Sequence, residues 1–223
     1  KNPFYGEYSF HYWLWKNDLK KIEDKEWIGF CQYRKFWSFE KQKKNYENIE
    51  DLNNALIKNI PVKFDEFDSI LGTPLYINQF KLSKFIKRDF IQIIKNPNLL
   101  FNKNKRNIKF HFDLMHGKGN LDQAISLLDI SDRQDFNDFV NTEVCFHPHN
   151  MFICNSKIKL NEYYNAVFPW LKRCESKFGF NLKGYGLKRI YGFLAERYMS
   201  FWFKKYTKST TLPIIFKDIG EID

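Results

Sequence analysis

The stretch that decides the fold is Glu26-Trp-Ile-Gly-Phe-Cys-Gln-Tyr33, which Arg34 and Lys35 follow directly. An apolar run of this length, bounded by charged residues, is typical of a short strand that is covered on both faces of a sheet. Ligands of open α/β sheets bind beyond the carboxyl ends of the strands. Tyr33, Arg34 and Lys35 therefore form a candidate anion site, because a guanidinium and an ammonium together suit a phosphate. The alternative is a solvated basic turn.

Further strands and helices are predicted on either side of this stretch. Short apolar runs predict strands at Phe67–Leu71, stopped by Gly72 and Pro74, and at Asn150–Cys154. Apolar residues at helical spacing predict helices over residues 5–22, in the second part of 41–58, over 79–95, twice within 120–140, over 158–178 and over 187–205. The basic, Asn-rich residues 98–119 predict a long mobile loop. Short buried strands separated by helices are typical of an α/β fold.

Length and composition limit the class of protein. The chain has 223 residues, no internal repeat and no Gly/Ser- or Pro-rich linker, so we expect a single domain over residues 1–223. Apolar residues make up 43% of the chain, which excludes a disordered chain. The sequence contains no run of about 18 apolar residues, so we expect no transmembrane helix. No signal-peptide pattern is present. The four cysteines form no CxxC pair and match no zinc spacing, which favours the reducing cytoplasm. Cys31 and Cys154 stand inside apolar runs, so we expect both to be buried.

The net charge of +10 raises the question of a nucleic-acid partner. Only seven of the 36 basic residues are arginines, and the lysines are scattered along the chain. This pattern favours a generally basic, solvated surface, so we expect no nucleic-acid partner and keep salt-dependent RNA binding as a weaker alternative. A phosphate-bearing substrate or an anionic membrane would use the same charge, so peripheral membrane association stays open.

Polar groups also gather before the Asn150–Cys154 strand, at His147-Pro148-His149-Asn150. Two histidines at this spacing could bind a metal, although the sequence offers no third ligand nearby. A hydrogen-bonding wall for a polar substrate is an equal candidate. The alternative is a turn at the entry to the strand, with Asn150 as its local cap.

Two acidic segments complete the candidates. Glu196 and Arg197 lie in an otherwise apolar helical stretch, where a carboxylate can act as a general base or form a structural ion pair with arginine. Asp65 and Asp68 lie next to a predicted strand and could hold a divalent cation. For this second pair we favour a solvated loop.

Four blocks of the sequence, taken together, resemble a known family. They are residues 2–17, which begin with Asn-Pro and end with Trp-Lys-Asn, residues 27–36, His149–Ile153 and Gly192–Arg197. In this order and spacing they resemble a bacterial capsular and exopolysaccharide glycosyltransferase family, long catalogued as a domain of unknown function, whose characterised relatives include galactofuranosyltransferases. That family carries a strand ahead of the Asn-Pro block, so we expect the first strand of the fold to be missing from this chain.

The resemblance implies a GT-A-like, Rossmann-like glycosyltransferase domain with a central sheet flanked by helices. By topological analogy, the strand at 26–32 takes the place where many GT-A enzymes carry an Asp-x-Asp metal motif. Gln32 stands where the family usually has His, and it can hydrogen-bond but cannot titrate. The implied donor site is Gln32, Tyr33, Arg34 and Lys35. We expect these cations to make a divalent ion dispensable; manganese or magnesium on Asp65 and Asp68 is the alternative.

The implied function is transfer of a sugar, with galactofuranose the leading candidate, from a UDP-sugar or other nucleotide-sugar donor to a growing capsular or other surface polysaccharide. The acceptor would be an oligosaccharide or a lipid-linked glycan. Glu196 would be the catalytic base, and the sugars would contact His147, His149, Asn150 and Arg197. We expect Tyr12 and Trp15 to belong to the core rather than to a sugar-stacking surface. The alternative is a non-catalytic glycan-binding or assembly module.

Overall fold

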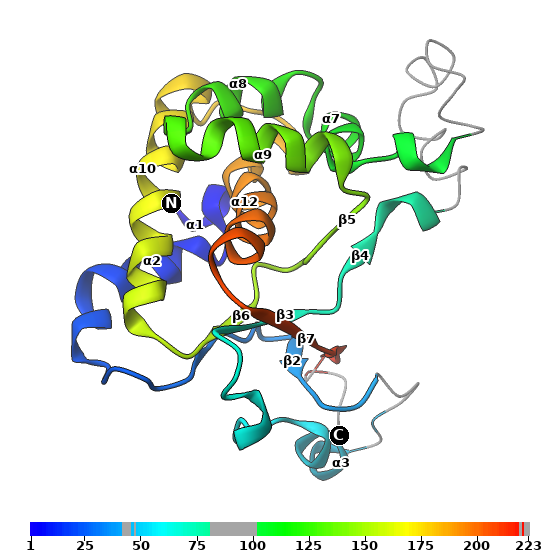
Figure 1. Cartoon of the computed structure of the whole chain (residues 1–223). Helices are drawn as coiled ribbons and strands as arrows, with labels where there is room; N and C mark the ends of the chain where they lie inside the picture. Colours follow the sequence, from blue (N-terminus) through cyan, green and yellow to red (C-terminus); the bar gives the residue numbers. More distant parts are fainter. Residues whose placement is uncertain (42–45, 47, 81–101, 219, 221–223) are drawn as a thin grey trace.

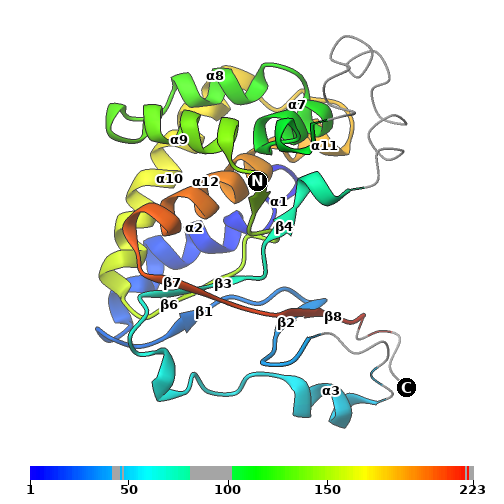
Figure 2. The ribbon, with the colours of Figure 1, turned by 45° about the vertical axis from the view of Figure 1, so that its right-hand side comes forward.

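The computed structural model describes residues 1–220 apart from 42–45, 47, 81–101 and 219. Most helices lie on one side of a four-stranded sheet, and the short helix α3 (Ile49–Ala55) lies on the other side (Figures 1 and 2). This arrangement confirms the α/β fold that the alternation of short strands and helices predicts.

The main sheet has the strand order β1 (Ile28–Gly29), β6 (Phe152–Cys154), β3 (Ser69–Gly72) and β7 (Ser209–Leu212). Strand β6 runs antiparallel to both β1 and β3, whereas β3 and β7 are parallel. Strands β1, β3 and β7 therefore end at the same edge of the sheet, and β6 begins there. This edge carries the candidate site.

The strand predicted at residues 26–33 is shorter than expected, and the prediction that both its faces are covered was wrong. Strand β1 has two residues, lies at the edge of the sheet and has Gly29 exposed. Cys31, expected to be buried, is exposed, whereas Cys154 is buried as predicted. The reason is that β2 (Lys35–Trp37) begins only two residues after Tyr33, so the apolar run leads into a tight turn and cannot continue along the sheet.

The tail after the last helix, for which the sequence predicted no element, completes two sheets. Strand β7 pairs with β3, and β8 (Ile214–Phe216) pairs antiparallel with β2. A third, two-stranded sheet joins β4 (Leu75–Tyr76) to β5 (Cys145–Phe146). The β2–β8 pairing holds the chain in place directly after the Gln32–Lys35 turn.

The remaining helices are α1 (Asn2–Tyr5), α2 (Tyr8–Asn17), α7 (Ile108–His116), α8 (Asn120–Ser126), α9 (Ile130–Thr142), α10 (Lys157–Phe178), α11 (Tyr185–Lys188) and α12 (Ile190–Tyr206). Short 3-10 turns occur at Leu19–Lys21, Val62–Phe64, Ile77–Gln79 and Lys103–Lys105. The helices predicted within 41–58, within 120–140, over 158–178 and over 187–205 are confirmed. The helix predicted over 5–22 forms only over Tyr8–Asn17, because α1 ends before it at Gly6, whose φ of 58° is accessible to glycine at little cost.

The loop predicted at 98–119 was wrong where the structure describes it. The Asn107 side chain caps α7 by accepting the N–H of Phe110 at 2.8 Å, and α7 buries Ile108 and Phe112. Two signals, a cap residue and an apolar face, were therefore present within a basic and Asn-rich composition. The helix predicted at 79–95 falls almost wholly on residues 81–101, outside the described residues.

Helix α12 organises the core, because it is buried on nearly all sides and packs against α1, α9 and α10. A Cβ on Gly192 would stand 3.1 Å from the Tyr5 carbonyl oxygen, so the glycine allows α1 to approach α12 closely. This approach brings the junction of α1 and α2 to the start of α12. None of the helices among the described residues is both long and apolar enough to span a bilayer.

Candidate functional site

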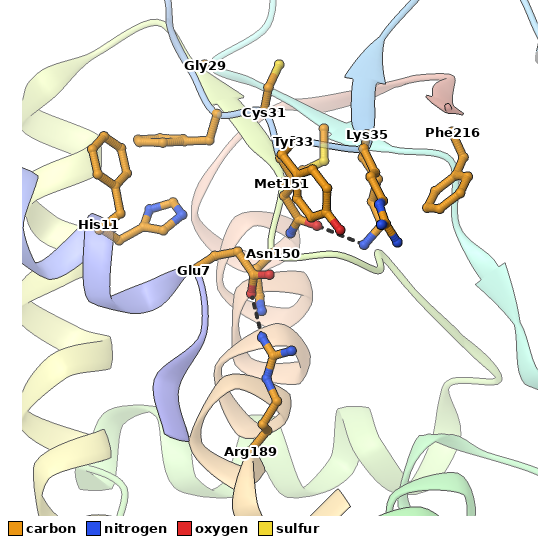
Figure 3. A pocket seen from close by; sticks show the side chains of 14 residues that line it. Glu7, His11, Gly29, Cys31, Tyr33, Lys35, Asn150, Met151, Arg189 and Phe216 are labelled. Carbon is orange, nitrogen blue, oxygen red and sulfur yellow. Dashed lines mark hydrogen bonds and ion pairs between the residues drawn. The ribbon is translucent and has the colours of Figure 1, made fainter. Parts of the chain in front are cut away.

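A cavity of about 500 Å³ lies beyond the carboxyl end of β1. Figure 3 shows Glu7 and Arg189 reaching toward each other from different elements, while Lys35 and Tyr33 enter from the opposite side. The polar and charged residues of its wall are Glu7, His11, Cys31, Gln32, Tyr33, Arg34, Lys35, Asn150 and Arg189. The position agrees with the expectation that a ligand of this sheet binds at the strand ends.

A smaller cavity of about 190 Å³ adjoins the first. The two cavities, together called the cleft below, share the wall residues Glu7, Gln32, Lys35, Asn150 and Arg189. The smaller cavity adds His149 and Glu196. The structure therefore brings together three predicted segments that are far apart in sequence, the Gln32–Lys35 turn, the His149-Asn150 pair and α12.

The Gln32–Lys35 turn is closed by two backbone hydrogen bonds of 3.1 Å between its first and last residues. The Gln32 side chain then links two parts of the cleft, since its Nε2 donates to the His149 carbonyl oxygen and its Oε1 accepts from Lys35 Nζ at 2.8 Å. Burial lowers the pKa of Lys35, while Glu7 and Glu196 act in the opposite direction. Lys35 is thus a partly desolvated cation that an anion can meet at short range.

Arg34 and Tyr33 lie at the outer part of the larger cavity. Tyr33 is 69% exposed, and the Arg34 guanidinium lies over its ring at 4.6 Å. Arg34 also pairs with Asp218 of the tail, with 2.7 Å between Nη2 and Oδ2, and its Nε is buried without a hydrogen-bond partner. A phosphate at Arg34 would therefore share the guanidinium with the Asp218 carboxylate or displace that carboxylate.

The His149-Asn150 pair has an unusual backbone, because both residues lie in the left-handed region with φ values of 81° and 54°. The Glu196 carboxylate accepts the His149 N–H at 2.5 Å, which holds the turn against α12. Asn150 donates from Nδ2 to the Gly192 carbonyl oxygen at 3.2 Å, and its Oδ1 is buried without a partner. Burial, followed by the charge of Lys35, lowers the pKa of His149 to about 4.

Glu196 is buried beneath this turn. One carboxylate oxygen accepts the His149 N–H, and the other pairs with Arg197 Nη1. Burial raises the pKa of Glu196, whereas Arg197, the His149 N–H and Lys35 act against that rise. Both oxygens of the predicted base therefore already have partners within the protein.

Glu7 and Arg189 line both cavities, although the sequence assigned neither of them to the site. Their side chains pair at 3.5 Å, and a Cβ on Gly6 would stand 2.2 Å from Arg189 Nη2. Gly6 therefore leaves the space that Arg189 occupies. The signal in the sequence was the Gly6-Glu7 step at a break between helices, but nothing local identifies Arg189 as its partner.

The sequence of the chain shows the family to which it belongs. A family model described as a domain of unknown function, DUF4422, matches residues 1–208. The chain belongs to this family.

A solved structure described as the apo form of the WbbM bifunctional glycosyltransferase is similar to this DUF4422 chain, with a TM-score of 0.69 at 19% identity. The similarity covers 96% of this chain and 37% of the WbbM chain, so the DUF4422 chain spans little more than a third of that protein. The two therefore share a fold. No curated protein sequence matches the chain.

Two predicted sugar-contacting residues of the DUF4422 chain lie outside the walls of the cleft. His147 Nδ1 bonds with the Gly72 carbonyl oxygen at 2.6 Å, and the His147 N–H donates to Ser200. Arg197 is 1% exposed, pairs with Glu196, contacts His111 and lies 3.8 Å over the Phe146 ring. His147 is held by backbone and Ser200 contacts next to the His149 turn, and Arg197 pairs with Glu196. Both residues therefore support the wall of the cleft without lining it.

The two acidic metal candidates, Asp65 and Asp68, lie at the opposite edge of the sheet from the His147 and His149 pair. Asp68 precedes β3, where its Oδ2 accepts the Lys208 N–H at 2.8 Å, and Asp65 is exposed nearby. Within the described part of the chain, no three His, Cys, Asp or Glu side chains cluster closely enough to hold a metal ion.

A third cavity of about 630 Å³ lies beside α2 and α10, and its wall combines aromatic side chains, including Tyr12, Trp15 and Phe168, with the charged side chains of Lys1, Lys16, Lys172 and Glu175. Tyr12 is exposed, so its predicted place in the core was wrong, whereas Trp15 is half-buried and stacks on Phe168. None of the predicted site residues lines this cavity. The cleft is therefore the candidate active site of this DUF4422 chain.

Proposed function

We propose that the chain transfers a sugar from a nucleotide-sugar donor to a growing surface polysaccharide. One observation carries this proposal: the cleft gathers three cations, Arg34, Lys35 and Arg189, beside the two carboxylates Glu7 and Glu196. The cations suit a diphosphate that becomes more negative as it leaves, and a carboxylate suits removal of a proton from an acceptor hydroxyl. The fold shared with a glycosyltransferase structure supports the proposal.

The larger cavity is the proposed donor site. The diphosphate would lie between Lys35 and Arg189, because the Gln32–Lys35 turn and the start of α12 present these two side chains to one space, and Arg34 of the same turn would lie at its outer side. The donor that we propose is UDP-galactofuranose, and the sheet would be of the GT-A type. Both details rest on the resemblance of the four sequence blocks.

The smaller cavity is the proposed sugar and acceptor site. Its volume of about 190 Å³ suits part of a sugar ring, and Asn150 and His149 offer polar groups to hydroxyls. The acceptor that we propose is an oligosaccharide or a lipid-linked glycan. Because three side-chain cations can neutralise the leaving diphosphate, we also propose that transfer needs neither manganese nor magnesium.

The test is incubation of the protein with a panel of nucleotide sugars and surface-glycan acceptors, with products followed by mass spectrometry. The expected result is transfer from UDP-galactofuranose, unchanged by EDTA. Activity that EDTA abolishes and manganese restores would reverse the proposal on metal. Glycan binding without transfer or hydrolysis of any donor would instead support a non-catalytic glycan-binding module.

A further inference from the structure

We propose that Glu7, rather than Glu196, is the base that removes the proton from the acceptor hydroxyl; this inference rests on the proposed transfer reaction. The two carboxylates line the same small cavity from different elements. They differ in the hydrogen-bond and ion-pair partners that their carboxylate oxygens have within the protein. This difference decides which of them can receive a proton from the acceptor.

Glu196 is held within the protein on both sides. Its two oxygens take the His149 N–H and the Arg197 guanidinium, and the residue is 8% exposed. A proton arriving on this carboxylate would weaken an ion pair with a buried arginine, which is costly in a water-poor interior. Glu196 therefore serves to hold the His149 turn in its left-handed conformation.

Glu7 has the opposite surroundings. Its side chain is 36% exposed, lies 3.5 Å from Arg189 and makes no hydrogen bond among the described residues. Its backbone is nevertheless well fixed, because the Glu7 carbonyl oxygen accepts the N–H groups of Phe10 and His11 at 2.9 and 3.2 Å. The carboxylate is thus both available to a substrate and positioned by the start of α2.

Asn150 supplies an independent observation that points to a ligand at the same place. It is 6% exposed, lines both cavities together with Glu7, and its Oδ1 is buried without a partner. A buried acceptor without a hydrogen bond is costly and is expected where a substrate completes it. A hydroxyl group of the bound sugars would satisfy Asn150 Oδ1 and leave the neighbouring carboxylate to receive the proton of the attacking hydroxyl.

The resulting step balances without a further reactant. The acceptor hydroxyl gives its proton to the Glu7 carboxylate while its oxygen forms a bond to the anomeric carbon of the donor. The bond from that carbon to the phosphate oxygen breaks, and its electron pair leaves with the nucleoside diphosphate toward Lys35 and Arg189. Attack opposite the leaving group inverts the anomeric configuration of the sugar.

The experiment compares Glu7→Gln with wild type and with Glu23→Gln, a control at an exposed position outside the cleft. For Glu7→Gln we expect kcat to fall by about a hundredfold or more, with the melting temperature unchanged and UDP affinity not reduced, because the variant removes a negative charge beside Arg189. Glu7→Asp, which keeps the carboxylate, should recover part of the turnover. Glu23→Gln should behave as wild type, and the wild-type product should have inverted configuration.

Different results would overturn the two proposals separately. A wild-type protein that transfers sugar, together with a Glu7→Gln variant that keeps its turnover, would reject only the role of Glu7. A loss of turnover in Glu7→Gln that follows a fall in melting temperature or in UDP affinity would make Glu7 a structural or donor-binding residue. A folded wild-type protein without transfer from any donor would reject the proposed function and the base with it.

Discussion

The two carboxylates of the small cavity show how position within the fold separates chemically identical groups. Glu196 lies inside α12, where Arg197 and the His149 N–H meet both of its oxygens. Glu7 lies at the junction of α1 and α2, where Arg189 is its ion-pair partner at 3.5 Å. A carboxylate whose two oxygens both have partners within the protein contributes to structure. A carboxylate with an oxygen still accessible to a substrate can accept the proton of that substrate.

Removal of Arg197 should produce the largest effect and test the structural side of this comparison. Arg197→Met keeps an apolar stem near Phe146 but leaves Glu196 buried without its cation. We expect a loss of about 3–5 kcal/mol in the free energy of unfolding, measured by urea denaturation. The double variant with Glu196→Gln should recover part of the loss, and a single variant as stable as wild type would break the comparison.

Loss of Arg34 should have the next largest effect, on donor affinity. Arg34→Ala should weaken UDP binding by about tenfold, measured by calorimetry, because a charged hydrogen-bond donor to the diphosphate is lost. Arg34→Lys should recover only part of it, since the bidentate fork is absent. Arg173→Ala, on α10 outside the cleft, is the matched control, and unchanged affinity in Arg34→Ala would remove this residue from the donor site.

Substitution of Glu196 should have a smaller effect on turnover than substitution of Glu7. Glu196→Gln keeps an acceptor for the His149 N–H but loses the charge opposite Arg197. We expect kcat of the folded variant to fall by less than about tenfold, while the melting temperature falls measurably. A hundredfold loss of kcat at unchanged stability would exchange the roles of the two carboxylates.

The smallest effect concerns His149, which lines the same small cavity as Glu7 and Glu196. Because burial and Lys35 lower its pKa to about 4, the ring binds its proton only well below neutral pH and is uncharged above about pH 5. His149→Asn, which tolerates the left-handed backbone, should therefore leave the pH dependence of kcat/KM between about pH 6 and pH 8 unchanged. A change of the profile in that range would show that His149 titrates near neutral pH in the working protein.

Local sequence predicted the longer helices and the places of β1, β3 and β6, but it predicted none of β2, β4, β5, β7 and β8. Apolar spacing predicts the helices at 158–178 and 187–205 and the strands that became β3 and β6, since these patterns report directly which faces are buried. Apolar spacing gave a wrong prediction where an apolar run and a tight turn overlap in the sequence. The run at 26–33 reads as a central strand, but the Gln32–Lys35 turn that follows it leaves only Ile28–Gly29 in the sheet.

The candidate site was predictable only where its residues lie in a recognisable block. Gln32, Lys35, His149 and Asn150 stand at the ends of apolar runs, so their types and positions were visible in the sequence. Arg189 gave no such signal, because its place in the cleft depends on the space that Gly6 leaves, more than 180 residues away along the chain.

The sequence by itself determined the alternation of short strands and helices, the basic surface and the four blocks that carry the family resemblance. Tertiary structure alone decided which partner each charged group meets. The helical spacing of Glu196 allowed either a base accessible to a substrate or a member of a buried ion pair. Its contacts with Arg197 and with the His149 turn place it in a buried ion pair. The physical reason is that periodicity records which faces are buried, whereas the availability of a charge depends on burial and hydrogen bonds across segments that only packing brings together.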